Sequence, residues 1–346
     1  MADIVSRKQD HLDLSISGDV GFRKTHLFEC VELMHDALPE LSLDEVDTGT
    51  QLLGKRLRAP ILIAAMTGGS GRAKTINLEL ASIAEECGYA FGMGSQRAML
   101  TNPETLTSYS IRSAAPTALV LGNIGGVQAS KLELAQMAEL VGSVGADALC
   151  VHLNPAMELV QPEGDRDFRC ILHTLGKLSH ELGLPVIAKE TGCGISPSVA
   201  QRLRNCGVNH VDVSGAGGTS WVAVESERLP DPRQNLGQAF RDWGIPTAAS
   251  VAYCNHAGFE TIIATGGIKN GLEVAKAVAM GAHAAGIARP VLQAFHNGGR
   301  QGALQFLRRI EGELRMAMLL TGARNLGAMR NVERRVMSPL RHWLLP

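Results

Sequence analysis

The sequence predicts an α/β protein with the (β/α)8, or TIM, barrel architecture, and three observations support this prediction. From residue 59 onward the chain contains eight short apolar runs, each followed by a segment with helical periodicity. Each run ends in polar or glycine-rich residues, whereas an open doubly wound sheet would concentrate such residues at one switch point. The eight units extend over about 250 residues, which is the typical size of a (β/α)8 barrel.

The composition narrows the class of protein. The chain has 346 residues, of which 45% are hydrophobic, so a large core is available. Its 33 Lys and Arg balance 34 Asp and Glu, and no general basic field indicates nucleic-acid binding. The seven cysteines occur singly, which is typical of reduced thiols. The first ten residues lack the apolar core of a signal peptide, and no apolar run approaches the ~20 residues that span a bilayer. We therefore expect a soluble, cytoplasmic protein that binds neither nucleic acid nor membrane.

The chain divides into three expected parts. Residues 1–58 form an irregular, polar N-terminal segment, residues 59–325 form the barrel, and residues 326–346 form a C-terminal tail. In the first part, Arg7, Lys8 and His11 lie close enough to share a helical face and to clamp an anion. The alternative is a solvated basic patch.

The expected elements follow in order along the barrel segment. The apolar runs, expected as parallel strands buried on both faces, are residues 60–66, 89–93, 117–121, 148–151, 185–189, 209–213, 261–264 and 284–287. The expected connections, mostly helical, are residues 74–87, 103–114, 131–144, 168–182, 248–255, 271–280 and 302–321. Ser196 followed by Pro197 predicts one further helix start. A polar insertion at residues 215–243, after the sixth strand, is expected to form a loop over the barrel mouth.

The carboxyl ends of all the strands of a barrel meet at one face, which predicts the site. The residues expected around this mouth are Met66, Thr67, Gly68, Ser95, Gln96, Arg97, Asn123, His152, Asn154, Lys189, Ser214, Thr219, Gly266, Gly267, Ala288 and Arg289. The last two pairs follow the seventh and eighth strands, the usual place for a phosphate. The alternative for the glycines is that they only permit tight turns.

Three residues of the mouth indicate particular chemistry. A lysine at the depth of Lys189 needs a negative partner, such as the N1–C2=O edge of a reduced flavin, and a Schiff-base role is the competing interpretation. Glu190 beside it is expected to be a structural ion-pair member. Glu158 is the best metal candidate, because Mg²⁺ is commonly held by one carboxylate plus substrate phosphates. A surface glutamate at a helix start is the alternative.

Several motifs follow one another in a specific order and spacing. They are Arg7-Lys8 with His11, Met66-Thr-Gly-Gly69, Gly94-Ser-Gln-Arg97, His152-Leu-Asn-Pro155, Gln161-Pro-Glu-Gly-Asp-Arg-Asp-Phe168, Lys189-Glu190, Gly215-Ala-Gly-Gly-Thr-Ser-Trp221 and Ala264-Thr-Gly-Gly-Ile-Lys-Asn-Gly271. Together they resemble the type 2 isopentenyl-diphosphate isomerases. The resemblance implies an FMN-containing barrel that interconverts isopentenyl and dimethylallyl diphosphate with Mg²⁺, with NADPH to keep the flavin reduced, and as a homotetramer or homo-octamer.

The resemblance also implies roles for individual residues. The FMN positions are Ala65, Met66, Thr67, Ser95, Asn123, Lys189, Ser214, Thr219, Gly266, Gly267, Ala288 and Arg289. The substrate positions are Arg7, Lys8, His11, Ser95, Gln96, Arg97, His152, Asn154 and Met157, and the Mg²⁺ ligand is Glu158. Lys189, His152 and Asn154 are the expected catalytic residues, and reduced FMN itself would move the protons.

Met157 departs from the family pattern, which has a glutamine here. A thioether cannot donate the hydrogen bond that an amide donates. If the glutamine shapes proton transfer, activity on the usual substrate would change; if it only lines the pocket, little is lost. The alternatives are therefore an FMN-dependent oxidoreductase acting on a hydroxy acid and a flavin-binding protein without catalysis.

Overall fold

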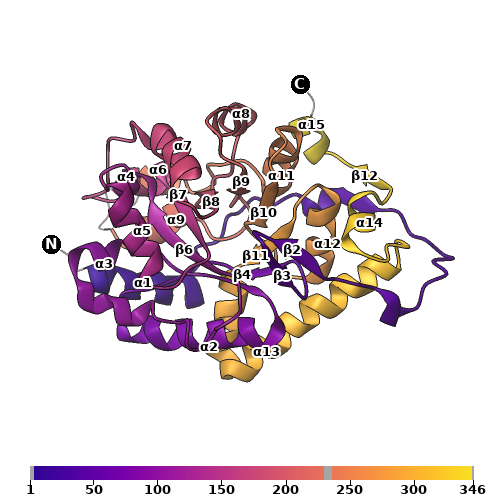
Figure 1. The fold of residues 1–346 in the computed structure, drawn as a ribbon. Helices are drawn as coiled ribbons and strands as arrows, with labels where there is room; N and C mark the ends of the chain where they lie inside the picture. The colour runs from indigo at the N-terminus through magenta and orange to yellow at the C-terminus, as the bar shows by residue number, and fades with distance from the viewer. Residues whose placement is uncertain (1–3, 230–235, 345–346) are drawn as a thin grey trace.

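Eight parallel strands form a closed barrel, which confirms the predicted fold (Figure 1). The computed structural model describes residues 4–229 and 236–344. In barrel order the strands are β4 (Ile61–Ile63), β5 (Ala90–Gly92), β6 (Val120–Gly125), β7 (Ala148–Leu153), β8 (Val186–Glu190), β9 (His210–Asp212), β10 (Thr261–Thr265) and β11 (Ala284–Ile287). Each overlaps one of the expected apolar runs, but β6 shares only residues 120 and 121 with the run 117–121 and continues to Gly125, through the segment that was expected to follow the strand.

Most residues on both faces of these strands are buried, which explains why the strands are rich in apolar residues. Side chains that face the barrel interior form one core cluster with Leu62, Ile187 and Ile263, and the outward side chains pack against the surrounding helices in a larger cluster. Leu52 and Leu57 join the interior cluster from the hairpin of β2 (Thr50–Leu52) and β3 (Lys55–Leu57).

The helices surround the barrel (Figure 1). In chain order they are α2 (Gly71–Cys87), α3 (Arg97–Thr101), the 3-10 helix η3 (Pro103–Ser108), α4 (Gly126–Ala129), α5 (Leu134–Gly142), α6 (Pro155–Val160), α7 (Ile171–Glu181), α8 (Pro197–Asn205), α9 (Trp221–Glu227), α11 (Thr247–His256), α12 (Gly271–Ala279) and α13 (Arg289–Leu319). Ser196 caps α8 as predicted, because its side chain accepts a hydrogen bond from the Val199 N–H.

Two connections differ from the expectation. Residues 103–114 contain only the short 3-10 helix η3, since Asn102 caps it and Pro103 stands at its first turn. The last barrel helix starts at Arg289 instead of residue 302, and a kink at Gly298 and Gly299 interrupts it. Gly299 has a φ of 58° and a ψ of −155°, a conformation that only glycine adopts without strain.

The N-terminal segment is more regular than expected. It begins with α1 (Ile4–Ser17) and also contains η1 (Phe28–Cys30), β1 (Val31–Leu33) and η2 (Leu43–Glu45). Strand β1 pairs antiparallel with β12 (Arg334–Val336) of the C-terminal tail, which also contains α14 (Leu326–Arg330) and α15 (Leu340–Leu344).

The insertion after the sixth strand carries a helix rather than being wholly irregular. This helix, α9, packs against α6 near the barrel mouth. Residues 230–235 of the expected loop lie outside the described residues. Among the helices that the structure describes, none is long and apolar enough to cross a bilayer.

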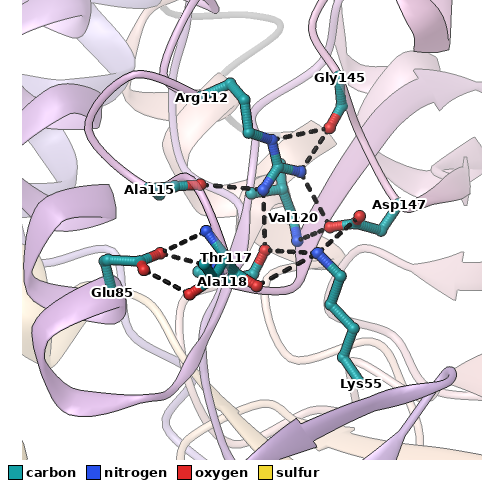
Figure 2. Close-up of polar contacts among 9 residues, drawn as sticks. All are labelled: Lys55, Glu85, Arg112, Ala115, Thr117, Ala118, Val120, Gly145 and Asp147. Carbon is teal, nitrogen blue, oxygen red and sulfur yellow. Dashed lines mark hydrogen bonds and ion pairs between the residues drawn. The ribbon is translucent and has the colours of Figure 1, made fainter.

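An ion-pair network joins the β2–β3 hairpin to the start of β6 (Figure 2). The Asp147 carboxylate lies 2.7 Å from Lys55 Nζ and 2.9 Å from Arg112 Nη2, and it accepts the Val120 N–H at 2.8 Å. Burial alone would raise the pKa of Asp147, but the hydrogen bonds from Lys55, Val120 and Arg112 hold it below its ordinary value. The network therefore stabilises the folded state while Asp147 is ionised.

Asp147→Asn is expected to lower the free energy of unfolding by about 1–3 kcal/mol, because Lys55 and Arg112 lose their shared anion. Urea unfolding followed by circular dichroism measures this change. Asp167→Asn is the matched control, since Asp167 and Arg169 form an exposed ion pair and the midpoint should stay at the wild-type value. Equal midpoints for all three proteins would show that the network contributes nothing.

Candidate active site

A cavity of about 590 Å³ opens at the carboxyl ends of the barrel strands and is bordered by α1. It is lined by every residue that the sequence analysis assigned to cofactor, substrate or metal, with the exception of Gln96. The prediction that the carboxyl ends of the strands meet at one site is therefore confirmed. The α1 side chains of Arg7, Lys8 and His11 line the same cavity.

Gln96 is a correction to the expected substrate residues. Its side chain is fully buried and lies outside the cavity lining. Its Nε2 donates to the Leu140 carbonyl at 3.0 Å, and its Oε1 accepts the Asn123 N–H at 2.9 Å. These bonds use both ends of the amide, so the Gln96 side chain connects α5 to β6 and does not line the cavity.

The glycine loops after β9 and β10 pack so closely that a side chain at Gly218 or Gly267 would clash with the other loop. Gly217 and Gly267 have φ values of 127° and 88°. A Cβ on Gly267 would lie 2.6 Å from the Gly217 carbonyl oxygen, and one on Gly218 would lie 2.5 Å from the Gly267 nitrogen. The close packing of the two loops therefore requires these glycines, and the loop backbone that also lines the cavity could form a cradle that binds a phosphate through its N–H groups.

Two buried hydroxyls beside this cradle indicate a polar ligand. The Oγ1 atoms of Thr67 and Thr265 have no hydrogen-bond partner among the described residues, and both threonines line the cavity. A buried hydroxyl without a partner costs about 1–3 kcal/mol, so such atoms usually have a partner that a ligand or water supplies. A bound phosphorylated cofactor with polar ring edges would supply these missing hydrogen-bond partners. The alternative, that the glycines only permit tight turns, leaves the two hydroxyls without partners.

Arg289 has a different role from the one its position suggests. Its guanidinium donates to the carbonyls of Ser15 at 2.8 Å and Gly18 at 2.6 Å, at the end of α1. The side chain therefore fixes the N-terminal helix across the mouth. The N-terminus of α13 has Ala288 at its N-cap position, without a side-chain cap, and Pro290 in its first turn, so it remains available to an anion.

Lys189 already has an anionic partner within the protein. Its Nζ lies 3.0 Å from Asp212 Oδ2 and donates to the Glu190 carbonyl at 3.1 Å. Asp212 was not predicted, although the parallel register of β8 and β9 places it directly beside Lys189. The signal in the sequence was an acidic residue between Val211 and Val213, near the end of the expected sixth strand.

Glu190 is not the ion-pair member that we expected. Its carboxylate accepts backbone N–H groups from Gly192 at 2.7 Å, from Gly194 at 3.1 Å and from Cys193. Burial raises its pKa to about 7, against the lowering effect of these bonds. Its function is to hold the loop after β8.

His152 is a neutral hydrogen-bonding group and not a cation. The Asn123 amide donates to the Met93 carbonyl, so its oxygen faces His152 and accepts from Nδ1–H at 2.8 Å. Burial, followed by the charges of Lys189, Arg97 and Lys8, lowers the pKa of His152 to about 3. Nε2 is therefore left as a hydrogen-bond acceptor.

The cationic side chains of α1 are held by Gln161 and Tyr109, which the sequence analysis did not assign to the site, and by the carbonyl of Ser95, which it did. Arg7 Nη1 donates to Gln161 Oε1 at 2.9 Å, and Lys8 Nζ donates to Tyr109 Oη at 2.7 Å and to the Ser95 carbonyl at 3.1 Å. Burial, and then the neighbouring Arg7 guanidinium, lowers the pKa of Lys8 to about 7. The pair forms a half-buried positive region that suits an anionic ligand.

Glu225 connects α1 to the insertion. This fully buried carboxylate on α9 lies 2.7 Å from His11 Nε2, 2.9 Å from Gln161 Nε2 and 2.8 Å from Arg228 Nη1. It was missed because its partner His11 lies 214 positions away in the sequence. A glutamate inside an apolar helix was the only local indication.

Glu158 lies at the cavity wall with both oxygens oriented. Oε1 accepts from the Asn154 amide at 2.8 Å, and Oε2 accepts the Asp165 N–H at 2.9 Å. The described part of the chain contains no group of three or more His, Cys, Asp or Glu residues that could hold a metal. A divalent cation at Glu158 would therefore need oxygen ligands from a bound substrate or water.

The chain is similar to known FMN-dependent proteins in sequence and in fold. The model of the FMN-dependent dehydrogenase family matches residues 154–335, and the chain belongs to this family. Mandelate oxidase has a TM-score of 0.65 at 21% identity, covering 92% of this chain and 94% of that chain. A putative lactate oxidase of Pediococcus acidilactici has a TM-score of 0.69 at 15% identity, covering 96% and 93%. These structural likenesses show the barrel fold alone.

Curated relatives define the family more narrowly. The isopentenyl-diphosphate delta-isomerase of Thermococcus kodakarensis is 43% identical over 98% of this chain and 93% of its own length. That of Methanothermobacter thermautotrophicus is 44% identical over 93% of this chain and 90% of its own length. The chain belongs to the isopentenyl-diphosphate delta-isomerase family.

Proposed function

We propose that this protein interconverts isopentenyl diphosphate and dimethylallyl diphosphate with reduced FMN as its cofactor. The observation that supports this most strongly is that one cavity has two separate regions suited to an anion. The glycine cradle with the N-terminus of α13 suits a cofactor phosphate. The cationic α1 residues Arg7 and Lys8 suit a diphosphate.

The proposed FMN site uses the backbone of the glycine loops for the phosphate and the unpartnered hydroxyls of Thr67 and Thr265 for polar groups of the cofactor. Lys189 provides a positive hydrogen-bond donor at the cavity wall. When bound, reduced FMN supplies the groups that give a proton to the alkene and remove one from the neighbouring carbon. The protein orients the substrate and excludes water.

In the proposed substrate site Arg7, Lys8 and Arg97 would hold the diphosphate, and Glu158 would hold a Mg²⁺ ion that offsets the charge of the bound diphosphate. Asn154 orients the Glu158 carboxylate through its amide. Neutral His152 offers Nε2 as an acceptor, so it adds no positive charge to the site. We further propose NADPH as the reductant of the flavin, a cytoplasmic location, and assembly as a homotetramer or homo-octamer.

Met157 lines the cavity together with Phe22 and Trp221, which gives this part of the wall an apolar character. A hydrocarbon tail is well accommodated there, so the wild-type protein is expected to be active. Met157→Gln should change kcat/KM for isopentenyl diphosphate by less than about tenfold, because Met and Gln have similar volumes.

Paired assays of the wild type and Met157→Gln with FMN, NADPH and Mg²⁺ test this expectation. FMN affinity serves as the control and should be equal in both proteins. A wild type that binds FMN yet has a hundredfold lower kcat/KM than Met157→Gln would show that Met157 has changed the reaction.

A further inference from the structure

The ion pair of Lys189 and Asp212 lies at the boundary between the barrel interior and the cavity. The exposed fractions of the two side chains are 9% and 2%. Lys189 lines the cavity, whereas Asp212 stands behind it, on β9. The second carboxylate oxygen of Asp212 accepts the Ser214 N–H at 3.2 Å, which fixes its orientation.

The other titratable groups around this pair do not take the place of Asp212 as the anionic partner of Lys189. Burial, followed by the Asp212 charge, raises the pKa of the Cys150 thiol to about 12, so the thiol is neutral. His152 is neutral as well. The Glu190 carboxylate is directed at the loop N–H groups, and only its backbone carbonyl accepts from Lys189. Among the described residues, Asp212 is the carboxylate that forms an ion pair with Lys189.

The Lys189–Asp212 pair presents a weaker positive electrostatic field to the cavity than an unpaired lysine would. An unpaired buried ammonium strongly favours any added negative charge nearby, because the local dielectric is low. A carboxylate 3.0 Å behind the ammonium turns that single charge into a dipole whose positive end faces the cavity. The hydrogen-bond donor is retained, while the attraction for additional negative charge is reduced.

We propose that Asp212 is a positioning residue that directs Lys189 at the bound flavin and limits how strongly the site favours the reduced, more negatively charged form of FMN. This inference rests on the proposed binding of FMN in the cavity. By limiting this preference, Asp212 would keep the reduced cofactor able to release and regain protons, which the proposed isomerisation requires. Neither the motifs nor the family comparison assigns a role to this residue.

Asp212→Asn tests the inference, since it removes the charge and keeps the size of the side chain. The dissociation constants of oxidised and dithionite-reduced FMN are measured for the reconstituted protein, together with the midpoint potential. The ratio of the oxidised to the reduced dissociation constant should rise at least tenfold, which corresponds to about 30 mV for a two-electron couple. Asp147→Asn is the matched control, because it alters a Lys–Asp pair outside the cavity and should leave this ratio unchanged.

Three results would overturn the inference. The first is a folded Asp212→Asn protein whose ratio equals that of the wild type. The second is a folded variant that binds neither form of FMN, since the reduced form should bind at least as tightly as before. The third is that both Asp212→Asn and Asp212→Ser fail to fold, which would assign the pair to stability alone. Failure of the wild type to bind FMN would instead refute the proposed function.

Discussion

Glu158→Gln is expected to lower kcat/KM for isopentenyl diphosphate by a hundredfold or more at saturating Mg²⁺, while FMN binding stays unchanged. The proposed Mg²⁺ site has one protein carboxylate, so the neutral amide removes the charge that holds the cation to the diphosphate. A hundredfold loss corresponds to about 2.7 kcal/mol of transition-state stabilisation. Steady-state kinetics across a Mg²⁺ titration measure the effect.

Glu163→Gln is the control for this experiment, because Glu163 is an exposed carboxylate in the segment that follows α6. It should keep wild-type activity and the same Mg²⁺ dependence. If Glu158→Gln lost less than threefold with an unchanged Mg²⁺ requirement, Glu158 could not be the metal ligand.

Lys8→Met is expected to raise KM for the diphosphate substrate by about 10- to 100-fold, because charge-assisted hydrogen bonds contribute about 1.5–3 kcal/mol. The pH dependence gives a second signature. The pKa of Lys8 is about 7 in the unliganded protein, so its ammonium is present below that pH and is lost above it. Substrate affinity in the wild type should therefore fall as pH rises from 7 to 9, by up to tenfold per pH unit.

This pH dependence should be absent in Lys8→Met, and Lys131→Met should behave as the wild type because Lys131 is exposed outside the cavity lining. Isothermal titration of the substrate at several pH values, with FMN bound and without turnover, separates affinity from catalysis. Identical profiles in the wild type and Lys8→Met would exclude Lys8 as a diphosphate ligand.

The strands and the convergence of their ends could be predicted from the sequence because both depend on local patterns. Short apolar runs followed by glycine or polar residues locate most strands and their carboxyl ends, wherever the neighbouring strands lie. The end of β6 was placed too early, because its last four residues, 122–125, include two glycines and an asparagine. The segment 103–114 was misjudged because Asn102 and Pro103 favour a 3-10 turn over the helix that a regular crossover would contain. Local capping chemistry decided that structure.

The partners of the site residues were beyond the reach of local patterns. Tyr109 and Glu225 contact α1 residues that lie 101 and 214 positions away in the sequence, and neither spacing nor periodicity relates them. Asp212 lies beside Lys189 through the register of two adjacent strands, which the apolar pattern does not specify. Gln96 shows the opposite limit: it stands between two cavity residues, yet its side chain turns away to bind the end of β6. Position at a strand end predicts proximity to the site but does not predict the direction of each side chain.

The most direct test of the proposed activity is to incubate the FMN-loaded, reduced protein with isopentenyl diphosphate and Mg²⁺ in D₂O and to follow the substrate by NMR. We expect dimethylallyl diphosphate to form with deuterium incorporated from solvent, and the flavin to show no net oxidation. Binding of FMN and isopentenyl diphosphate without any interconversion, or oxidation of a hydroxy acid in its place, would contradict the account.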